Sequence, residues 1–180
     1  MTLTVDGVKV IVTDPVQYRL LGCVFYGDPF HSAKEWSYDN EIGHLWNRFM
    51  RLGHEHEDYF ASVNMQPGIG YEVHIEPSDY DGTTNKEYYV FVGLSVRDGI
   101  EIPLEMFLKV LPSTCYVEFS TPVTRYDVAE SVFKELLSDG KKYSQSFPYI
   151  IQRYDERYLG LDNPDSMLDW LIPVEVSNHG

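Results

Sequence analysis

The chain is poor in cysteine. Only Cys23 and Cys115 occur among its 180 residues, and each lies within an apolar segment rather than in a spaced pair or cluster. This pattern excludes a disulfide framework and a zinc site built on clustered cysteines. We therefore expect both side chains to be buried free thiols.

Basic residues are also scarce. The chain carries 14 lysines and arginines against 28 aspartates and glutamates, which gives a formal net charge of -14. A phosphate backbone would be repelled by the mean field of such a protein. We therefore expect no direct binding to nucleic acid.

Long hydrophobic runs are missing as well. The apolar runs, such as VKVIV near the start and CVFY at 23–26, are far shorter than the ~20 residues that span a bilayer. No leader with a basic and then an apolar stretch precedes them. We expect a cytoplasmic protein that does not associate with a membrane.

Motifs that identify an enzyme are not found. GIGYE lacks the third glycine and the following helix of a dinucleotide fingerprint, and there is no Ser/His/Asp order or glycine-rich phosphate loop. The segment GHEHED at 53–58 has metal-binding residue types, but a His-x-His alternation needs an extended backbone and a further ligand. We interpret it as a polar linker and predict no metal, no cofactor and no catalytic residue.

Two segments have the periodicity of amphipathic helices. DNEIGHLWNRFMRLG, residues 39–53, offers Asp39 or Asn40 as N-cap and Gly53 as terminator. TRYDVAESVFKELLSDG, residues 124–140, combines Thr124 with Asp127 as a variant of the capping box and ends in glycine. The apolar stripe predicted for the first helix is Ile42, Leu45, Trp46, Phe49 and Met50.

Eight further segments are rich in β-branched and aromatic residues and are bounded by turn formers. They are GVKVIV, YRLLGCVFYG, YFASVNM, GYEVHIE, KEYYVFVGLSV, TCYVEFS, FPYIIQRY and MLDWLIPVEV. Strands combined with two helices predict an α+β fold, as one domain over residues 1–180.

The order of these segments contains an internal repeat of about 8–75 and 88–176, each half giving strand, helix, strand, strand. One helix covers only one face of each half. We therefore expect two pseudo-symmetric modules that form a curved antiparallel sheet, with both helices on one side and a ligand cleft on the other.

The blocks YRLLGCVFYGDP, EIGHLWNRF, GIGYEVHIE, FVGLSV, VLPSTCYVEF and QRYDERYLGLDNPDSMLDWLIPVEV follow one another from about Val8 to Val176. In this order they resemble the effector-binding domain of bacterial AraC-type and multidrug-responsive regulators, whose stand-alone members are called gyrase-inhibitor-like proteins. The resemblance implies two strand-helix-strand-strand modules around an aromatic pocket. Full-length regulators of this group add a helix-turn-helix domain, for which this sequence has no counterpart.

The family commonly carries a glutamate, followed two residues later by a tyrosine, in the strand before the closing one. That glutamate faces cationic ligands. Gln152 and Tyr154 stand at these positions here. The amide keeps a hydrogen-bonding oxygen and loses the formal charge. Gln152 is either an ordinary satisfied amide on a half-wet sheet face or part of the floor of a ligand cleft.

Strand alternation assigns faces to other polar residues. In TCYVEFS, Tyr116, Glu118 and Ser120 share one face, and the alternate apolar positions form the helix-packing face. Glu118 then points into the cleft or into solvent. In GYEVHIE, the face with Glu72, His74 and Glu76 is interpreted as solvated.

Aromatic residues make up 14% of the chain, which suits a pocket lined by flat rings as well as plain core packing. Together with the polar candidates they give the predicted ligand-binding set, which is Trp36, Tyr38, Tyr71, Tyr116, Glu118, Gln152, Tyr154 and Trp170.

Three functions fit these observations. The favoured one is capture of bulky aromatic or amphipathic small molecules, as a sensor component or a sequestering protein. The second is hydrolysis of strained electrophilic natural products, as in some stand-alone family members, although the neutral Gln152 argues against it. The third is a gyrase-inhibitor-like interaction with a protein partner, either a regulator or gyrase. The sequence leaves monomer and dimer open.

The cleft interpretation of Gln152, with Tyr116 and Tyr154 beside it, predicts a gain of function. Gln152→Glu should strengthen binding of a planar cationic dye by roughly 1 to 3 kcal/mol if the new carboxylate is desolvated and ionised. Burial raises the pKa of such an acid, so the gain should grow as pH rises. Calorimetry with one cationic and one neutral dye at two pH values measures it, and unchanged affinity throughout would place Gln152 outside the site.

Overall fold

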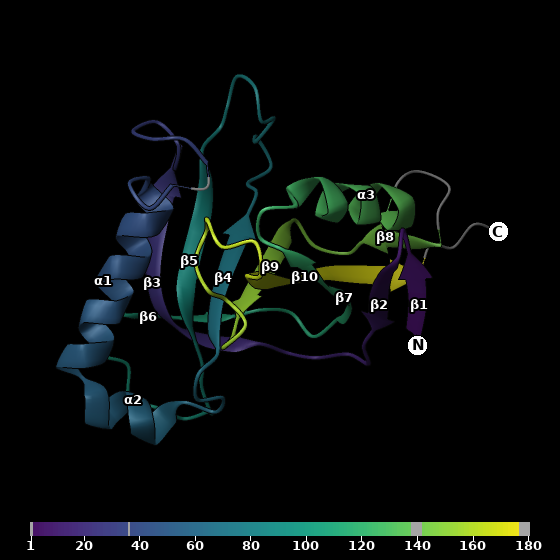
Figure 1. Cartoon of the computed structure of the whole chain (residues 1–180). Helices are drawn as coiled ribbons and strands as arrows, with labels where there is room; N and C mark the ends of the chain where they lie inside the picture. Colours follow the sequence, from purple (N-terminus) through teal and green to yellow (C-terminus); the bar gives the residue numbers. More distant parts are fainter. Residues whose placement is uncertain (1, 36, 138–141, 177–180) are drawn as a thin grey trace. The chain divides into compact units, whose positions relative to one another are not determined.

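The computed structural model describes residues 2–35, 37–137 and 142–176, which contain three α-helices and ten β-strands (Figure 1). The fold is α+β with antiparallel pairing between the strands, as predicted. The chain divides into two compact units. We call Tyr18–Leu111 the central unit, and Met1–Gln17 together with Pro112–Gly180 the terminal unit.

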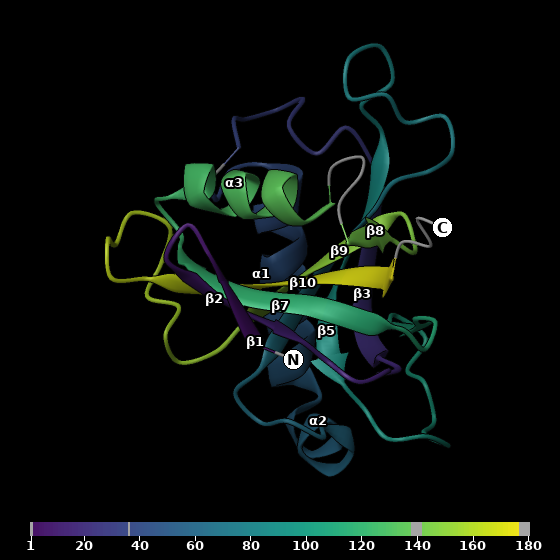
Figure 2. The ribbon, with the colours of Figure 1, turned by 90° about the vertical axis from the view of Figure 1, so that its right-hand side faces the viewer.

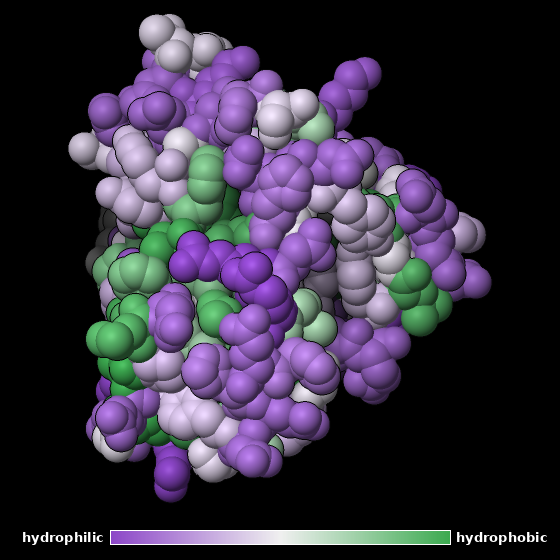
Figure 3. Space-filling model, turned by 90° about the vertical axis from the view of Figure 1, so that its left-hand side faces the viewer, coloured by the Kyte–Doolittle hydropathy of each residue, from purple (hydrophilic) through white to green (hydrophobic). Residues whose placement is uncertain are grey.

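The central unit contains a sheet in the order β4-β5-β3-β6. Its elements are β3 (Arg19–Gly27), α1 (Glu41–Glu55), α2 (Glu57–Val63), β4 (Gly70–Ile75), β5 (Tyr88–Ser95) and β6 (Phe107–Val110). Alternate residues of β3 and β5 form a core with Leu45, Phe49 and Leu52 of α1. Figure 3 shows the side of the molecule on which α1 lies in Figure 1, where hydrophilic side chains predominate and apolar ones gather toward the left of the view.

The terminal unit contains strands in the order β1-β2-β7-β10-β9, with β8 also paired to β10. Its elements are β1 (Thr2–Val5), β2 (Val8–Val12), β7 (Cys115–Pro122), α3 (Tyr126–Leu137), β8 (Tyr143–Gln145), β9 (Tyr149–Tyr154) and β10 (Met167–Val176). Figure 2 shows α3 beside β7 and β10, and its Ala129, Val132 and Leu136 are buried in one core with Phe119 and Trp170.

Both units contain the order strand, helix, strand, strand, as β3-α1-β4-β5 and as β7-α3-β9-β10. The predicted repeat began at residue 8, but the strand there, β2, pairs with β7 and belongs to the terminal unit. Superposition of the two halves and the assignment of one domain stay predictions.

One predicted strand and one predicted linker are wrong. YFASVNM, taken as a strand, lies largely in α2, and GHEHED spans the end of α1, the junction residue His56 and the start of α2. Tyr59 and Val63 are four residues apart and share one helix face. The Phe60 ring lies 5.6 Å from that of Phe49 in α1. Packing against α1 therefore overrides the strand propensity of this segment. Strands β1, β6 and β8 were not predicted.

The first helix begins as predicted and ends later. Gly53 was expected to terminate it, but α1 continues to Glu55. A Cβ atom at Gly53 would lie 3.1 Å from the ring of Phe60, so this glycine permits close approach of α2. Met50, predicted on the apolar stripe, is 64% exposed. The end of the second predicted helix, at Gly140, lies outside the described residues.

The two thiols differ in exposure. Cys23 is buried in the central unit, where burial raises the pKa of its thiol. Cys115, in the terminal unit, is partly exposed, and both cysteines are free. The expectation of two free thiols is confirmed, and full burial holds for Cys23 only. None of the helices among the described residues has the length and apolar character needed to cross a bilayer.

Asn40 is the N-cap of α1. Its Oδ1 accepts a hydrogen bond from the Gly43 amide at 2.9 Å, and its Nδ2 donates to the Lys34 carbonyl at 3.2 Å. Asn40→Ala should therefore lower the free energy of unfolding by about 1 kcal/mol. Urea denaturation measures this change. Asn47→Ala on the exposed surface of α1 makes the same substitution without a cap, and equal effects at both positions would contradict the capping role.

Candidate ligand-binding site

Strand β4 carries polar side chains on its helix-covered face. Its pairing with β5 places Glu72 opposite Val92 and His74 opposite Val90, and both valines belong to the core beneath α1. Residues directly opposite each other in an antiparallel pair point to the same face. Glu72 and His74 therefore face α1. The prediction that this side of the strand is solvated is wrong.

Glu72 is a buried carboxylate that is contacted by the side-chain nitrogens of Trp46 and His74. Only 3% of the residue is exposed. Its Oε2 accepts a hydrogen bond from the indole Nε1 of Trp46 at 2.5 Å, and Nε2 of His74 lies 2.6 Å from its Oε1. A buried glutamate is stable only with such partners. Because Trp46 belongs to α1, the carboxylate links the helix to the strand.

A series of ring contacts leads from the histidine that contacts this carboxylate. The ring of His74 lies 5.4 Å from that of Tyr88, and Tyr80 meets Tyr88 edge-on at 5.7 Å. Tyr88 is buried, whereas Trp46, His74 and Tyr80 are partly exposed. We call Trp46, Glu72, His74, Tyr80 and Tyr88 the Glu72 cluster. It combines a desolvated acid with rings that reach the surface.

The electrostatic environment of the cluster is negative. Burial raises the pKa of the Tyr88 hydroxyl, and the nearby carboxylates of Glu72, Glu35 and Asp28 raise it further. Tyr88 therefore stays a neutral phenol at physiological pH. A negative field beside π faces is the combination that attracts organic cations.

In the terminal unit, Gln152 lies on the α3 side of β9. It is 6% exposed and pairs with Trp170, whose ring packs against Phe133 of α3. The Tyr154 hydroxyl donates to Oε1 of Gln152 at 2.8 Å, and the ring of Tyr158 meets that of Tyr154 edge-on at 4.9 Å. Gln152 is thus a satisfied amide beside a pair of tyrosine rings.

Tyr116 does not join this group. Its register partner on β10 is Pro173, which places it on the face opposite Trp170 and Gln152. Its hydroxyl is 2.7 Å from that of Tyr149, and Tyr116 is fully buried. The expectation that Tyr116 lies beside Gln152 is wrong. The alternation predicted for Tyr116 and Glu118 is confirmed.

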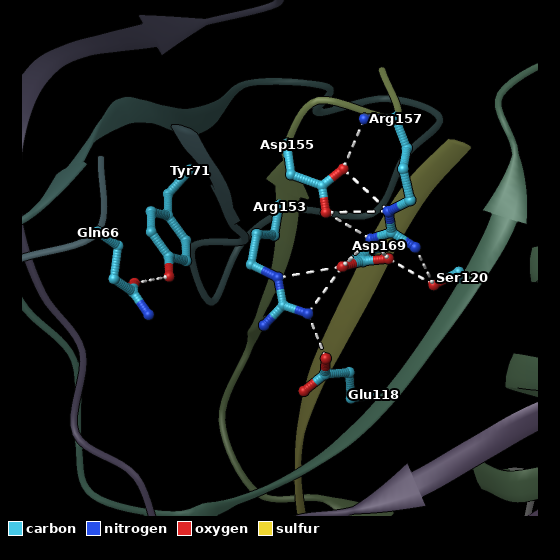
Figure 4. A network of polar contacts seen from close by, with 8 residues as sticks. All are labelled: Gln66, Tyr71, Glu118, Ser120, Arg153, Asp155, Arg157 and Asp169. Atoms are coloured by element: carbon cyan, nitrogen blue, oxygen red, sulfur yellow. Dashed lines mark hydrogen bonds and ion pairs between the residues drawn. The ribbon is translucent and has the colours of Figure 1, made fainter. Parts of the chain in front are cut away.

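Glu118 is part of an ionic network on that second face (Figure 4). The guanidinium of Arg153 bonds Glu118 and Asp169, with 2.7 Å between its Nη2 and Oδ2 of Asp169. Arg157 donates to Asp169 at 2.8 Å and to Asp155 at 2.6 Å. Burial alone would lower the pKa of Arg153, but the two carboxylates outweigh it and raise that pKa. Both arginines are therefore permanently charged and fixed.

Three predicted site residues remain. Tyr71 is fully buried on the face of β4 away from α1, and its hydroxyl donates to Gln66 (Figure 4). Tyr38 is 54% exposed in the segment before α1. Trp36 lies outside the described residues. Ligand contact by any of the predicted residues stays a prediction.

Glu72, His74 and Trp46 were not predicted to form a group. Trp46 was placed on the apolar stripe of the helix, and the face of β4 with Glu72 and His74 was interpreted as solvated. The burial pattern of β4 shows why this fails, since residues 71–73 are buried on both faces. Arg153 and Asp169 were missed because strand register brings them together across 16 residues of sequence.

No model of a protein family matches the chain. A curated relative is the transcriptional regulator BrlR of Pseudomonas aeruginosa, which is 27% identical over 139 residues. The match covers 74% of this chain and 46% of BrlR, so the chain spans about half the length of that regulator.

Solved structures share the fold. A structure of SAV2435 bound to tetraphenylphosphonium aligns with a TM-score of 0.63 and 11% identity, over 92% of this chain and 93% of that one. The C-terminal domain of EcmrR aligns with a TM-score of 0.59 and 10% identity, over 94% of this chain and 99% of that domain. The fold is thus shared by a protein seen with an aromatic cation. The AraC-type and gyrase-inhibitor-like assignments stay predictions.

The Asp169 network predicts a large loss of stability. Asp169→Asn should leave Arg153 partly buried without its principal counter-charge and lower the free energy of unfolding by roughly 3 kcal/mol. Chemical denaturation measures the loss. Asp165→Asn removes the same charge from an exposed site nearby in sequence and should have little effect. A small and equal effect at both positions would mean that the network is not stabilising.

Proposed function

We propose that this protein is an effector-binding module for aromatic organic cations, and that the Glu72 cluster supplies the charge recognition. The observation that carries the proposal is a carboxylate that is 3% exposed, contacts a tryptophan and a histidine, and is connected through that histidine to two tyrosine rings. A cation near this group meets a negative charge poorly screened by water. The rings add contact area and cation-π attraction.

The comparisons support this class of ligand. Tetraphenylphosphonium, present in the SAV2435 structure, has no N–H or O–H donor, so a protein holds it by charge, by ring contact and by burial of its apolar surface. The Glu72 cluster offers these two interactions. The similarity to BrlR supports a role in transcription regulation, as a sensor component.

The proposed charge-recognising residue, Glu72, differs from the position expected from the sequence. The resemblance placed the important acid at position 152, where this chain has a neutral glutamine. Glu72 supplies a full negative charge in the central unit, so we propose permanently cationic ligands. The hydrolase and gyrase-inhibitor-like alternatives stay predictions.

Glu72→Gln tests the charge. This substitution keeps a side chain of the same shape and an oxygen that accepts from Trp46. A unit charge about 6 Å away, at an effective dielectric constant of about 20, contributes roughly 3 kcal/mol. We therefore expect tetraphenylphosphonium to bind the variant at least about tenfold more weakly, as measured by calorimetry.

Glu105→Gln is the matched control, because Glu105 is an exposed glutamate of the same unit. It removes one negative charge, as Glu72→Gln does, and should leave affinity within about twofold, since exposed charges are screened. Equal affinities of the two variants would sink the proposal. Circular dichroism of both variants checks that the fold is retained.

A further inference from the structure

We infer that His74 is the resident cation of the Glu72 cluster, so that an aromatic cation binds in competition with the protonated imidazole and releases a proton. The inference rests on the proposed function and adds a specificity-determining residue to it. Nothing in the sequence comparison with BrlR or in the shared fold assigns a role to this histidine.

The contacts of His74 are those expected of a bound planar cation. Its Nε2 lies 2.6 Å from Oε1 of Glu72, and its ring lies 5.4 Å from the ring of Tyr88. Charge pairing with a buried carboxylate and contact with an aromatic ring are both satisfied by one side chain. An incoming cation of the proposed class would seek the same two partners.

The imidazole of His74 is more exposed to solvent than the carboxylate of Glu72. The His74 side chain is 25% exposed, whereas the Glu72 side chain is 4% exposed. Water therefore reaches the imidazole and hardly reaches the carboxylate. A ligand that approaches Glu72 from solvent meets His74 first.

The charged groups around His74 are acidic on each element that contacts it. Glu72 on β4 and Glu76 just after the strand flank it, and the His74 charge opposes the burial that raises the pKa of Glu76. From the segment before α1, Glu35 and Asp28 act on the neighbouring Tyr88. The imidazole thus lies in a region of negative charge, which also attracts a cationic ligand.

Other neighbours of His74 are uncharged. Trp46 of α1 contacts Glu72 through its indole N–H, and the hydroxyls of Tyr88 and Tyr80 have pKa values raised mainly by burial. These groups keep one protonation state between pH 5 and pH 8. They therefore do not contribute to a change of binding over that range, and the His74→Gln variant separates the effect of the imidazole from that of the Glu76 carboxylate.

The direction of the pH dependence follows from competition. Below the imidazole pKa, His74 carries a positive charge that neutralises Glu72 and repels a cationic ligand. Above it, the imidazole is neutral and no longer competes with a cationic ligand for Glu72. Affinity for tetraphenylphosphonium should thus be about tenfold higher at about pH 8 than at about pH 5.5, because the competing positive charge is lost as the pH rises.

His74→Gln isolates the competitor. Glutamine retains an N–H donor for Glu72 and cannot be protonated in this range. Calorimetry with tetraphenylphosphonium, whose charge does not depend on pH, is run at about pH 5.5 and about pH 8 in buffers of different ionisation enthalpy. We expect proton release and a tenfold affinity change for the unmodified chain, and neither for His74→Gln.

His44→Gln is the matched control, because His44 lies 3.9 Å from Glu41 in an exposed pair on α1. It should retain the pH dependence and the proton release. If His74→Gln also retains them while Glu72→Gln loses binding, the inference about His74 is wrong and the proposed function stands. If the unmodified chain fails to bind the cation even at about pH 8, both are overturned.

Discussion

A buried carboxylate must accept hydrogen bonds or form ion pairs, and each of the two units contains one carboxylate that does so. In the central unit, Glu72 is met by Trp46 from the helix and His74 from its own strand. In the terminal unit, Asp169 is met by two arginines, of which Arg153 lies on β9 and Arg157 just beyond it. An uncompensated charge at either place would cost several kcal/mol. The arrangement of helix on sheet and of strand on strand is thus coupled to the pairing of these two acids.

The two acids differ in what they leave for a ligand. Asp169 is bound by fixed, permanently charged guanidinium groups, so its charge is already neutralised. Glu72 contacts a neutral indole and an imidazole, a type of side chain that can gain or lose a proton under physiological conditions. Neither of these two contacts is with a permanently charged group. This difference is why the Glu72 cluster, rather than the more conspicuous ionic network, is the better candidate for recognising a cation.

Much of the fold follows from local patterns in the sequence. Helical periodicity and a capping asparagine predict α1 from its first residue, and runs of β-branched residues predict the seven longest strands. Local patterns fail where tertiary contacts decide, as at Gly53, where the approach of Phe60 replaces helix termination. The site is less predictable for the same reason. Glu72 looks solvated when β4 is considered alone, and it becomes a buried acid only because Trp46 of α1 donates to it.

The two free thiols, Cys23 and Cys115, lie in different units and can each report on the local opening of its own unit. Cys23 lies in the core of the central unit, and Cys115 lies in the first long strand of the terminal unit. A thiol reagent attacks the thiolate, so burial and a raised pKa protect Cys23 until its surroundings open, while Cys115 is accessible in part from the start. Labelling kinetics followed by mass spectrometry therefore separate the opening of one unit from that of the other, without any engineered cysteine.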